Sequence, residues 1–211
     1  MLNVLTHGDP SLPKILIAHG LFGSGRNWGV IAKRLSDQFH VICPDMRNHG
    51  ASPWFDTQSY DDMADDLADL LDGPTFVVAY SHSQTQHIDA MRAVDLSGVE
   101  RRSQAGENLD PEVRDFLLQS LDAKEKKWLL NLDVLAAEMP KIIGFPEVSG
   151  SFDGPTLFLS GGDSDYVTPE YRPVIKDLFP NARFAKIPEA GHWLHAQKPR
   201  EFEATLRAFF S

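Results

Sequence analysis

Short apolar runs separated by amphipathic segments constrain the fold of this chain more than any other feature. The runs have the length of buried strands, and helical apolar spacing lies between them. They are Lys14–Ala18, Phe39–Cys43, Thr75–Ala79, Thr156–Ser160 and Arg183–Ile187. Strands that alternate with helices form parallel sheets covered on both faces. The sequence therefore predicts an α/β fold with a mostly parallel sheet.

Helices are expected at Trp28–Leu35, Ser59–Leu71, Pro169–Leu178 and Phe202–Phe210. Ser59 and Asp62 have the spacing of a capping box, in which each side chain bonds to the other's backbone N–H. The apolar residues of this helix, which share one face at helical spacing, are Met63, Leu67, Leu70 and Leu71. Its run of aspartates then forms the solvated face.

The middle of the chain, from about residue 87 to 144, has helical patterns and no convincing strand. Glu112–Leu121 and Lys126–Ala137 are both amphipathic. An all-helical insertion between strands is typical of a lid over an active site. We therefore expect one domain over residues 1–211, with a helical cap at 87–148. The segment from about Leu109 to Gly144 should pack its apolar residues over Leu21 and Phe22.

Composition excludes several classes of function. The chain has 211 residues, enough for one domain with a sizeable core, and a net charge of −10. That charge argues against nucleic acid and anionic membrane surfaces as partners. A single cysteine, Cys43, excludes an internal disulfide, and its place in an apolar run predicts a buried strand residue. No signal peptide or membrane-length apolar run is visible, so a cytoplasmic location is expected.

Two glycine-bearing motifs follow predicted strands and suggest catalysis. His19-Gly20-Leu21-Phe22-Gly23-Ser24 has the form of an oxyanion loop, whose backbone N–H groups meet a developing negative charge. In Gly191-His192, the histidine is placed to act as a general base. Between these motifs, Ser81 lies at the end of the third apolar run. The small residues Ala79 and Ser83, two positions before and after it, match the small-x-Ser-x-small pattern of a nucleophile elbow.

Several segments together resemble one family, the small bacterial α/β-hydrolase esterases with mitochondrial relatives. They are His19–Trp28, Pro44–Ser52, Phe116–Ser120, Ile142–Gly144, Gly161–Val167 and Ala190–His195. The resemblance implies the α/β-hydrolase fold with a helical cap, and hydrolysis of carboxylic esters through an acyl-enzyme. By resemblance, Leu21 or Phe22 supplies one oxyanion N–H, the residue after Ser81, His82, supplies the other, and His192 is the base.

The resemblance also reveals a gap. Members of the family continue from an elbow after the third strand into a long helix and a further strand ending in Asp-Ile-Ala-Pro. After Val78 this chain reads Ala79-Tyr80-Ser81-His82-Ser83, which resembles the stretch that normally leads into the cap. A βα unit takes roughly 30 residues or more. We therefore expect the chain to lack one central βα unit, leaving either a gap in the sheet or direct pairing of Thr75–Ala79 with Thr156–Ser160.

The supporting acid is affected by the same gap. The position that carries it in many α/β-hydrolases is Ser164 here, and the other source, the Asp-Ile-Ala-Pro segment, is missing. Asp163 and Asp165 flank Ser164 and are the candidate substitutes, with Asp165 preferred. His19, Asp45, Arg47 and His49 are interpreted as a structural polar cluster beneath the oxyanion loop, and His195 as structural.

Alternatives to an ester hydrolase remain at this stage. Ser81 is either the nucleophile or a polar residue at the deletion junction. The chain is then a serine hydrolase of short to medium acyl esters, impaired by the deletion, or an inactive remnant that binds a small molecule. A thioesterase or C–C bond hydrolase is the alternative enzyme, since the pocket sets the substrate. Neither metal-ligand spacing nor a nucleotide fingerprint is present, so no metal or cofactor is expected.

Overall fold

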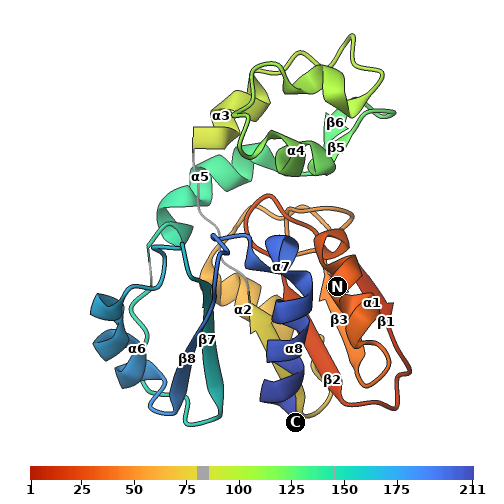
Figure 1. The fold of residues 1–211 in the computed structure, drawn as a ribbon. Helices are drawn as coiled ribbons and strands as arrows, with labels where there is room; N and C mark the ends of the chain where they lie inside the picture. Colours follow the sequence, from red (N-terminus) through yellow and green to blue (C-terminus); the bar gives the residue numbers. More distant parts are fainter. Residues whose placement is uncertain (80–85, 145) are drawn as a thin grey trace. The chain divides into compact units, whose positions relative to one another are not determined.

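The computed structural model describes residues 1–79, 86–144 and 146–211. The chain forms two compact units, Met1–Pro146 and Glu147–Ser211, and each has a sheet of its own (Figure 1). Ser81 and His82 lie outside the described residues. No helix in the described ranges is long and apolar enough to span a bilayer.

The sheet of the N-terminal unit has the strand order β1-β3-β2-β4. β2 (Lys14–Ala18), β3 (His40–Pro44) and β4 (Thr75–Ala79) are parallel, and all three were predicted, β3 with a shift of one residue. β1 (Val4–His7) runs antiparallel to β3 and was missed. It is short and mostly half-buried, so it lacks the apolar run that marks the other strands.

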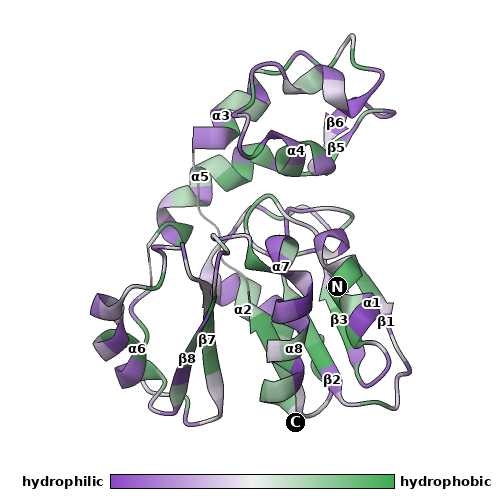
Figure 2. Cartoon of the chain, in the orientation of Figure 1, coloured by the Kyte–Doolittle hydropathy of each residue, from purple (hydrophilic) through white to green (hydrophobic). Residues whose placement is uncertain are grey.

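The centre of this sheet is apolar throughout. Ile15, Leu16 and Ile17 on β2 are completely buried, as expected for a parallel strand covered on both faces, and Figure 2 shows β2 and β3 as strongly hydrophobic. Cys43 on β3 is also buried, as predicted, and burial raises the pKa of its thiol to about 12. A thiol that stays protonated is a poor nucleophile, so Cys43 is a packing residue.

Helices α1 (Gly29–Leu35) and α2 (Tyr60–Ala68) flank the sheet. The predicted capping box of α2 is present, because the side chains of Ser59 and Asp62 each accept from the other's backbone N–H. Met63, Leu67 and Leu70 pack against sheet and loop residues Leu16, Ala18 and Met46. Leu71 was placed on the same face but lies beyond the helix end and is 38% exposed.

The inserted segment, residues 86–142, is less helical than predicted. It contains α3 (Gln86–Arg92), α4 (Arg114–Leu117), a small hairpin of β5 (Leu121–Asp122) and β6 (Lys127–Trp128), α5 (Leu132–Ile142), and the 3₁₀ turns Arg102–Gly106 and Leu118–Ser120. The predicted helices at 112–121 and 126–137 are therefore wrong in extent. The Asp122 carboxylate accepts from the N–H groups of Lys124 and Glu125. This local bonding favours a turn over a helix.

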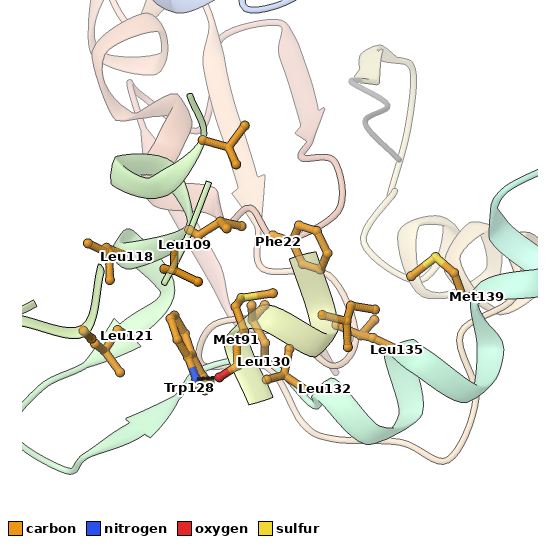
Figure 3. Close-up of a cluster of buried hydrophobic side chains, with 14 of the residues drawn as sticks. Phe22, Met91, Leu109, Leu118, Leu121, Trp128, Leu130, Leu132, Leu135 and Met139 are labelled. Carbon is orange, nitrogen blue, oxygen red and sulfur yellow. Dashed lines mark hydrogen bonds between the residues drawn. The ribbon is translucent and has the colours of Figure 1, made fainter. Parts of the chain in front are cut away.

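An apolar cluster joins the inserted segment to the loop after β2 (Figure 3). Phe22 is buried in it among leucines and methionines of α3, α5 and the hairpin region, and Leu21 packs against it. The indole N–H of Trp128 donates to the Met91 carbonyl at 2.9 Å. The predicted packing of this segment over Leu21 and Phe22 is confirmed.

The C-terminal unit is built on two parallel strands, β7 (Thr156–Gly161) and β8 (Ala182–Ile187). Its helices are α6 (Arg172–Leu178), α7 (Leu194–Gln197) and α8 (Pro199–Phe210), with a 3₁₀ turn at Pro169–Tyr171. The rings of Phe158 and Phe184 stack across the two strands at 5.6 Å, and Phe179 packs edge-on to Phe158. The late strands and both predicted late helices are confirmed.

Strand β4 is an edge strand although its sequence is that of a central one. In the described part of the chain β4 pairs only with β2, and β7 pairs only with β8. Phe76 and Val77 on β4 are 38% and 52% exposed. Apolar parallel strands are normally buried on both faces, so β4 has the exposure expected when a neighbouring strand is missing.

An exposed, uncharged, apolar edge strand is a template for pairing with another chain. We expect Val77→Lys to reduce self-association, measured by sedimentation velocity, while changing the free energy of unfolding by no more than about 0.5 kcal/mol, as for a surface site. Val41→Lys, at a fully buried position of β3, is the matched control and should unfold the unit. Unchanged self-association in Val77→Lys would contradict an open edge at β4.

Candidate active site

The loop after β2 makes a tight turn at the predicted oxyanion motif. The Gly23 N–H donates to the Gly20 carbonyl at 3.0 Å, which closes a four-residue turn. Within it, Phe22 has φ +64°, the positive value that the third position of a type II turn requires. Glycine usually fills that position. A bulky residue there costs roughly 1–3 kcal/mol of backbone strain, so other contacts must hold Phe22 in place.

Three contacts from three segments hold Phe22. Its N–H donates to His49 Nε2 at 3.3 Å, and its carbonyl accepts from the Ser120 hydroxyl at 2.8 Å. Its ring packs edge-on to the His87 ring, with centroids 6.4 Å apart. Sequence analysis missed Ser120 and His87 as partners of this loop. Ser120 lies within a family-like segment, but nothing in its local sequence signals a bond to a residue so far away.

His19 and His49 connect two loops reciprocally. His19, on the loop after β2, accepts from the Met46 N–H at Nε2 and donates from Nδ1 to the Gly20 carbonyl, at 2.9 and 2.8 Å. His49, on the loop after β3, accepts from Phe22 and donates from Nδ1 to the Arg47 carbonyl at 2.8 Å. Both rings therefore carry their proton on Nδ1. The predicted structural role of both histidines is confirmed.

Burial keeps both imidazoles neutral. It lowers the pKa of His49 to about 3, with a further decrease from the nearby His19, and it lowers the pKa of His19 as well. The two rings lie edge to face, 5.1 Å between centroids. Protonation of either ring would place a charge in an apolar environment and remove the lone pair that accepts a backbone N–H.

Asp45 fixes the ends of the same two loops. Its buried carboxylate accepts from the N–H groups of Gly25 and Ala51, both at 2.8 Å, and from the Asn3 amide at 2.9 Å. Gly50 packs so closely that a Cβ there would lie 2.3 Å from the carboxylate, and its φ is +58°. Asp45 is thus a structural hub, as predicted, and it requires glycine at position 50.

These bonds distinguish the two predicted oxyanion donors. The Phe22 N–H points at His49 Nε2 and is already used. Leu21 lies at the preceding turn position and packs against the apolar cluster. The bond to His49 therefore conflicts with the predicted donor role of Phe22, while the donor role of Leu21 stays a prediction.

In the C-terminal unit, two loops lie together at the ends of β7 and β8. The Asp163 N–H donates to the Ala190 carbonyl at 3.0 Å, and the Gly162 N–H donates to the Ile187 carbonyl at 2.7 Å. A Cβ on Gly161 would lie 2.1 Å from the carbonyls of Ala190 and Gly191, so only glycine permits this approach. The loop carrying Asp163 and Asp165 is therefore tied to the loop carrying His192.

His192 lies just past β8, where it was expected. Its ring stacks on Tyr166, with centroids 3.9 Å apart. Asp163 and Asp165 are both exposed on the adjoining loop. His195 is buried, and burial lowers its pKa to about 4, with a further decrease from His192. Burial and a neutral ring fit the structural role expected of His195.

The model of the alpha/beta hydrolase family matches residues 15–205, nearly the whole chain. The chain belongs to this family. It is 34% identical to the sn-1-specific diacylglycerol lipase ABHD11 of Mus musculus, covering 98% of this chain and 84% of that protein. It is 35% identical to Esterase YbfF of Escherichia coli, covering 92% and 90%. A solved structure, a marine microorganism esterase, has a TM-score of 0.88 at 31% identity and covers 99% of this chain and 98% of that one.

The family alignment also supports the missing βα unit. The match to the mouse lipase extends over 257 positions, and this chain has 211 residues in all. The relative therefore has residues with no counterpart here. The exposed edge of β4 fits a loss directly after that strand.

The buried histidine pair predicts a pH-dependent stability. Because the folded state keeps His49 neutral, the unfolded state binds more protons as the pH falls from 6.5 toward about 3, and the fold loses stability over that range. We expect His49 to contribute a loss of about 1.4 kcal/mol per pH unit over this range. Urea unfolding of wild type and His49→Gln between pH 4 and 7.5 measures the difference.

His49→Gln cannot titrate, so its stability should fall less steeply with acid than that of wild type. The carboxylates contribute equally to both proteins and cancel in the comparison. Parallel curves for the two proteins would contradict a neutral, buried His49.

Proposed function

We propose that this chain hydrolyses carboxylic esters of short to medium acyl length through an acyl-enzyme. The proposal rests on the loop of residues 19–25, whose strained turn is fixed by hydrogen bonds with buried side chains. Preorganised N–H donors aimed at developing charge are a large source of catalysis. Relatives named as an esterase and a lipase support the same reaction class.

In the proposed reaction, Ser81 Oγ attacks the ester carbonyl carbon while His192 takes its proton. Asp165 or Asp163 orients the imidazolium, and the N–H groups of Leu21 and His82 stabilise the oxyanion. Collapse of the tetrahedral intermediate expels the alcohol, which takes the proton from His192. Water, activated by His192, then attacks the acyl-enzyme and releases the carboxylic acid and Ser81.

We further propose that residues 87–148 act as a cap in one hydrolase domain of residues 1–211. The support is the apolar cluster that the inserted segment shares with Phe22. An acyl chain bound at the partly buried residues that pack against this cluster, such as Leu21 and Phe116, would replace water there. The head group of the ester would then lie at the 19–25 loop.

The missing βα unit should impair turnover. Ser81 follows the end of β4, which pairs with β2 alone among the described strands and has exposed apolar side chains. Catalytic groups must be held within about 0.5 Å of productive geometry. We expect kcat below about 1 s⁻¹, the low end for ordinary enzymes. A cooperatively folded protein that hydrolyses p-nitrophenyl butyrate faster than this would contradict the expected impairment.

A fluorophosphonate probe distinguishes a slow hydrolase from an inactive binding protein. The probe phosphonylates an activated serine, and peptide mass spectrometry locates it. We expect one label, on Ser81, lost in Ser81→Ala and kept in the matched control Ser83→Ala. No labelling of the folded protein would favour the non-catalytic alternative, and labelling elsewhere would refute Ser81 as nucleophile.

Ser81→Ala and His192→Ala should each lower kcat by about 10⁴-fold or to background, because members of a catalytic triad act as a unit. The measurement is the initial rate on p-nitrophenyl butyrate, with the protein concentration of each variant fixed by absorbance. His40→Ala, at the start of β3, is a control that should keep the rate. Equal activity in wild type and Ser81→Ala would refute the mechanism.

The same assay ranks the two candidate acids. Asp165→Asn should lower kcat strongly and Asp163→Asn weakly, since we prefer Asp165 as the residue that orients His192. The exposure of both side chains means that neither substitution should destabilise the fold by more than about 0.5 kcal/mol. Full activity in both variants would show that the acid lies elsewhere or is not used.

A further inference from the structure

The loop after β3 contacts the inserted segment as well as the loop after β2. The Gly50 N–H donates to the Leu129 carbonyl at 2.8 Å, and the Asn131 N–H donates to the Asn48 carbonyl at 2.9 Å. These bonds surround an antiparallel bridge between His49 and Leu130. Asn131 also donates through its side chain to the Asn48 side chain at 3.2 Å.

His49 is the residue at which these contacts meet. Its backbone pairs with Leu130 of the inserted segment, and its imidazole Nδ1 bonds to the carbonyl of Arg47. The remaining ring nitrogen, Nε2, accepts the Phe22 N–H. The ring is 2% exposed, so water does not compete for that bond. Among the described residues, His49 is the side chain that accepts the Phe22 N–H.

We propose that His49 is a positioning residue of the oxyanion loop. By accepting the Phe22 N–H, its Nε2 holds the peptide between Leu21 and Phe22 in the type II orientation, so that Leu21 rather than Phe22 supplies the donor to substrate. Through its pairing with Leu130, it fixes this loop to the inserted segment. The inference rests on the proposed hydrolase function for its catalytic consequence, but its geometry can be tested without turnover.

The orientation follows from the turn itself. In a type II turn the central peptide is reversed relative to a type I turn, and the third residue then needs positive φ. Loss of the acceptor on His49 would remove the bond that balances the strain of Phe22. The turn would then relax toward negative φ, the peptide would reverse, and the Phe22 N–H would leave the interior.

The first experiment measures the bond directly in the full-length protein. A scalar coupling across the hydrogen bond between the Phe22 amide nitrogen and His49 Nε2, in protein labelled with ¹⁵N, is expected in wild type. His49→Phe removes the acceptor and keeps a ring, whereas His49→Gln places an amide oxygen close to the position of Nε2. We expect a large shift of the Phe22 amide resonance in His49→Phe and a small one in His49→Gln.

His40→Phe is the matched control, since His40 is a histidine of the same unit whose ring contacts the Gly8 carbonyl and not this loop. It should leave the Phe22 amide unchanged. Absence of the coupling in folded wild type, or an unmoved Phe22 amide in folded His49→Phe, would overturn the proposal. If His49→Phe fails to fold, the coupling in wild type and the Phe22 amide shift in His49→Gln still test whether His49 accepts the Phe22 N–H.

The second experiment measures catalysis. We expect His49→Phe to lower kcat on p-nitrophenyl butyrate tenfold or more, on the order of the loss seen when an oxyanion donor is misplaced, with KM little changed, and His49→Gln to restore most of it. A purely structural residue would lower thermal stability and leave kcat of the folded fraction unchanged, which would overturn the catalytic role. If wild type shows no turnover, the proposed function fails, and the amide measurement alone decides the geometry.

Discussion

The left-handed backbone of Phe22 is the constraint on which the rest of the N-terminal unit depends. A buried phenylalanine at φ +64° is retained only because its N–H, carbonyl and ring are each held by a different segment. A buried N–H left without an acceptor costs about 1–3 kcal/mol. The loops after β2 and β3 avoid this cost through two neutral histidines, each of which accepts an N–H from the other loop. Neutrality is essential, because a protonated ring has no lone pair to offer.

The contacts that hold the 19–25 loop all come from the N-terminal unit. They involve β2, β3, the loops after these strands and the inserted segment, which all lie within residues 1–146. On β4, by contrast, the apolar side chains of Phe76 and Val77 are exposed. We propose that the loss of a βα unit after β4 leaves the contacts of the 19–25 loop intact and weakens the support of the segment that leads to Ser81. A folded protein with slow chemistry is the expected consequence.

Much of the fold could be predicted from the sequence, because parallel strands buried on both faces leave continuous apolar runs. The capping box at Ser59 and the polar cluster of His19, Asp45 and His49 were also recognisable from local sequence. β1 could not be found, since half-buried edge residues carry no apolar signal. The hairpin at 121–128 was missed because its amphipathic pattern resembles a helix, and the Asp122 turn overrides that pattern.

The choice between Leu21 and Phe22 as donor could not be made from sequence. It depends on a bond between residues 27 positions apart, and nothing local indicates where the Phe22 N–H points. The approach of the loop carrying Asp163 and Asp165 to the loop carrying His192 likewise depends on backbone contacts that only the folded chain makes. Ser81 and His82 lie outside the described residues, so their roles rest on the family pattern and the proposed experiments.

Native-state hydrogen exchange of the full-length protein tests most directly whether the loop of residues 19–25 stays ordered without the missing βα unit. The account predicts that the amides of Phe22 and Met46 open with nearly the same free energy as those of β2 and β3. The amides of β4 should open more easily, because β2 is the one described strand that pairs with it. If the amides of Phe22 and Met46 instead exchange as fast as those of the exposed loops while β2 and β3 stay protected, the two histidine bonds do not fix the 19–25 loop.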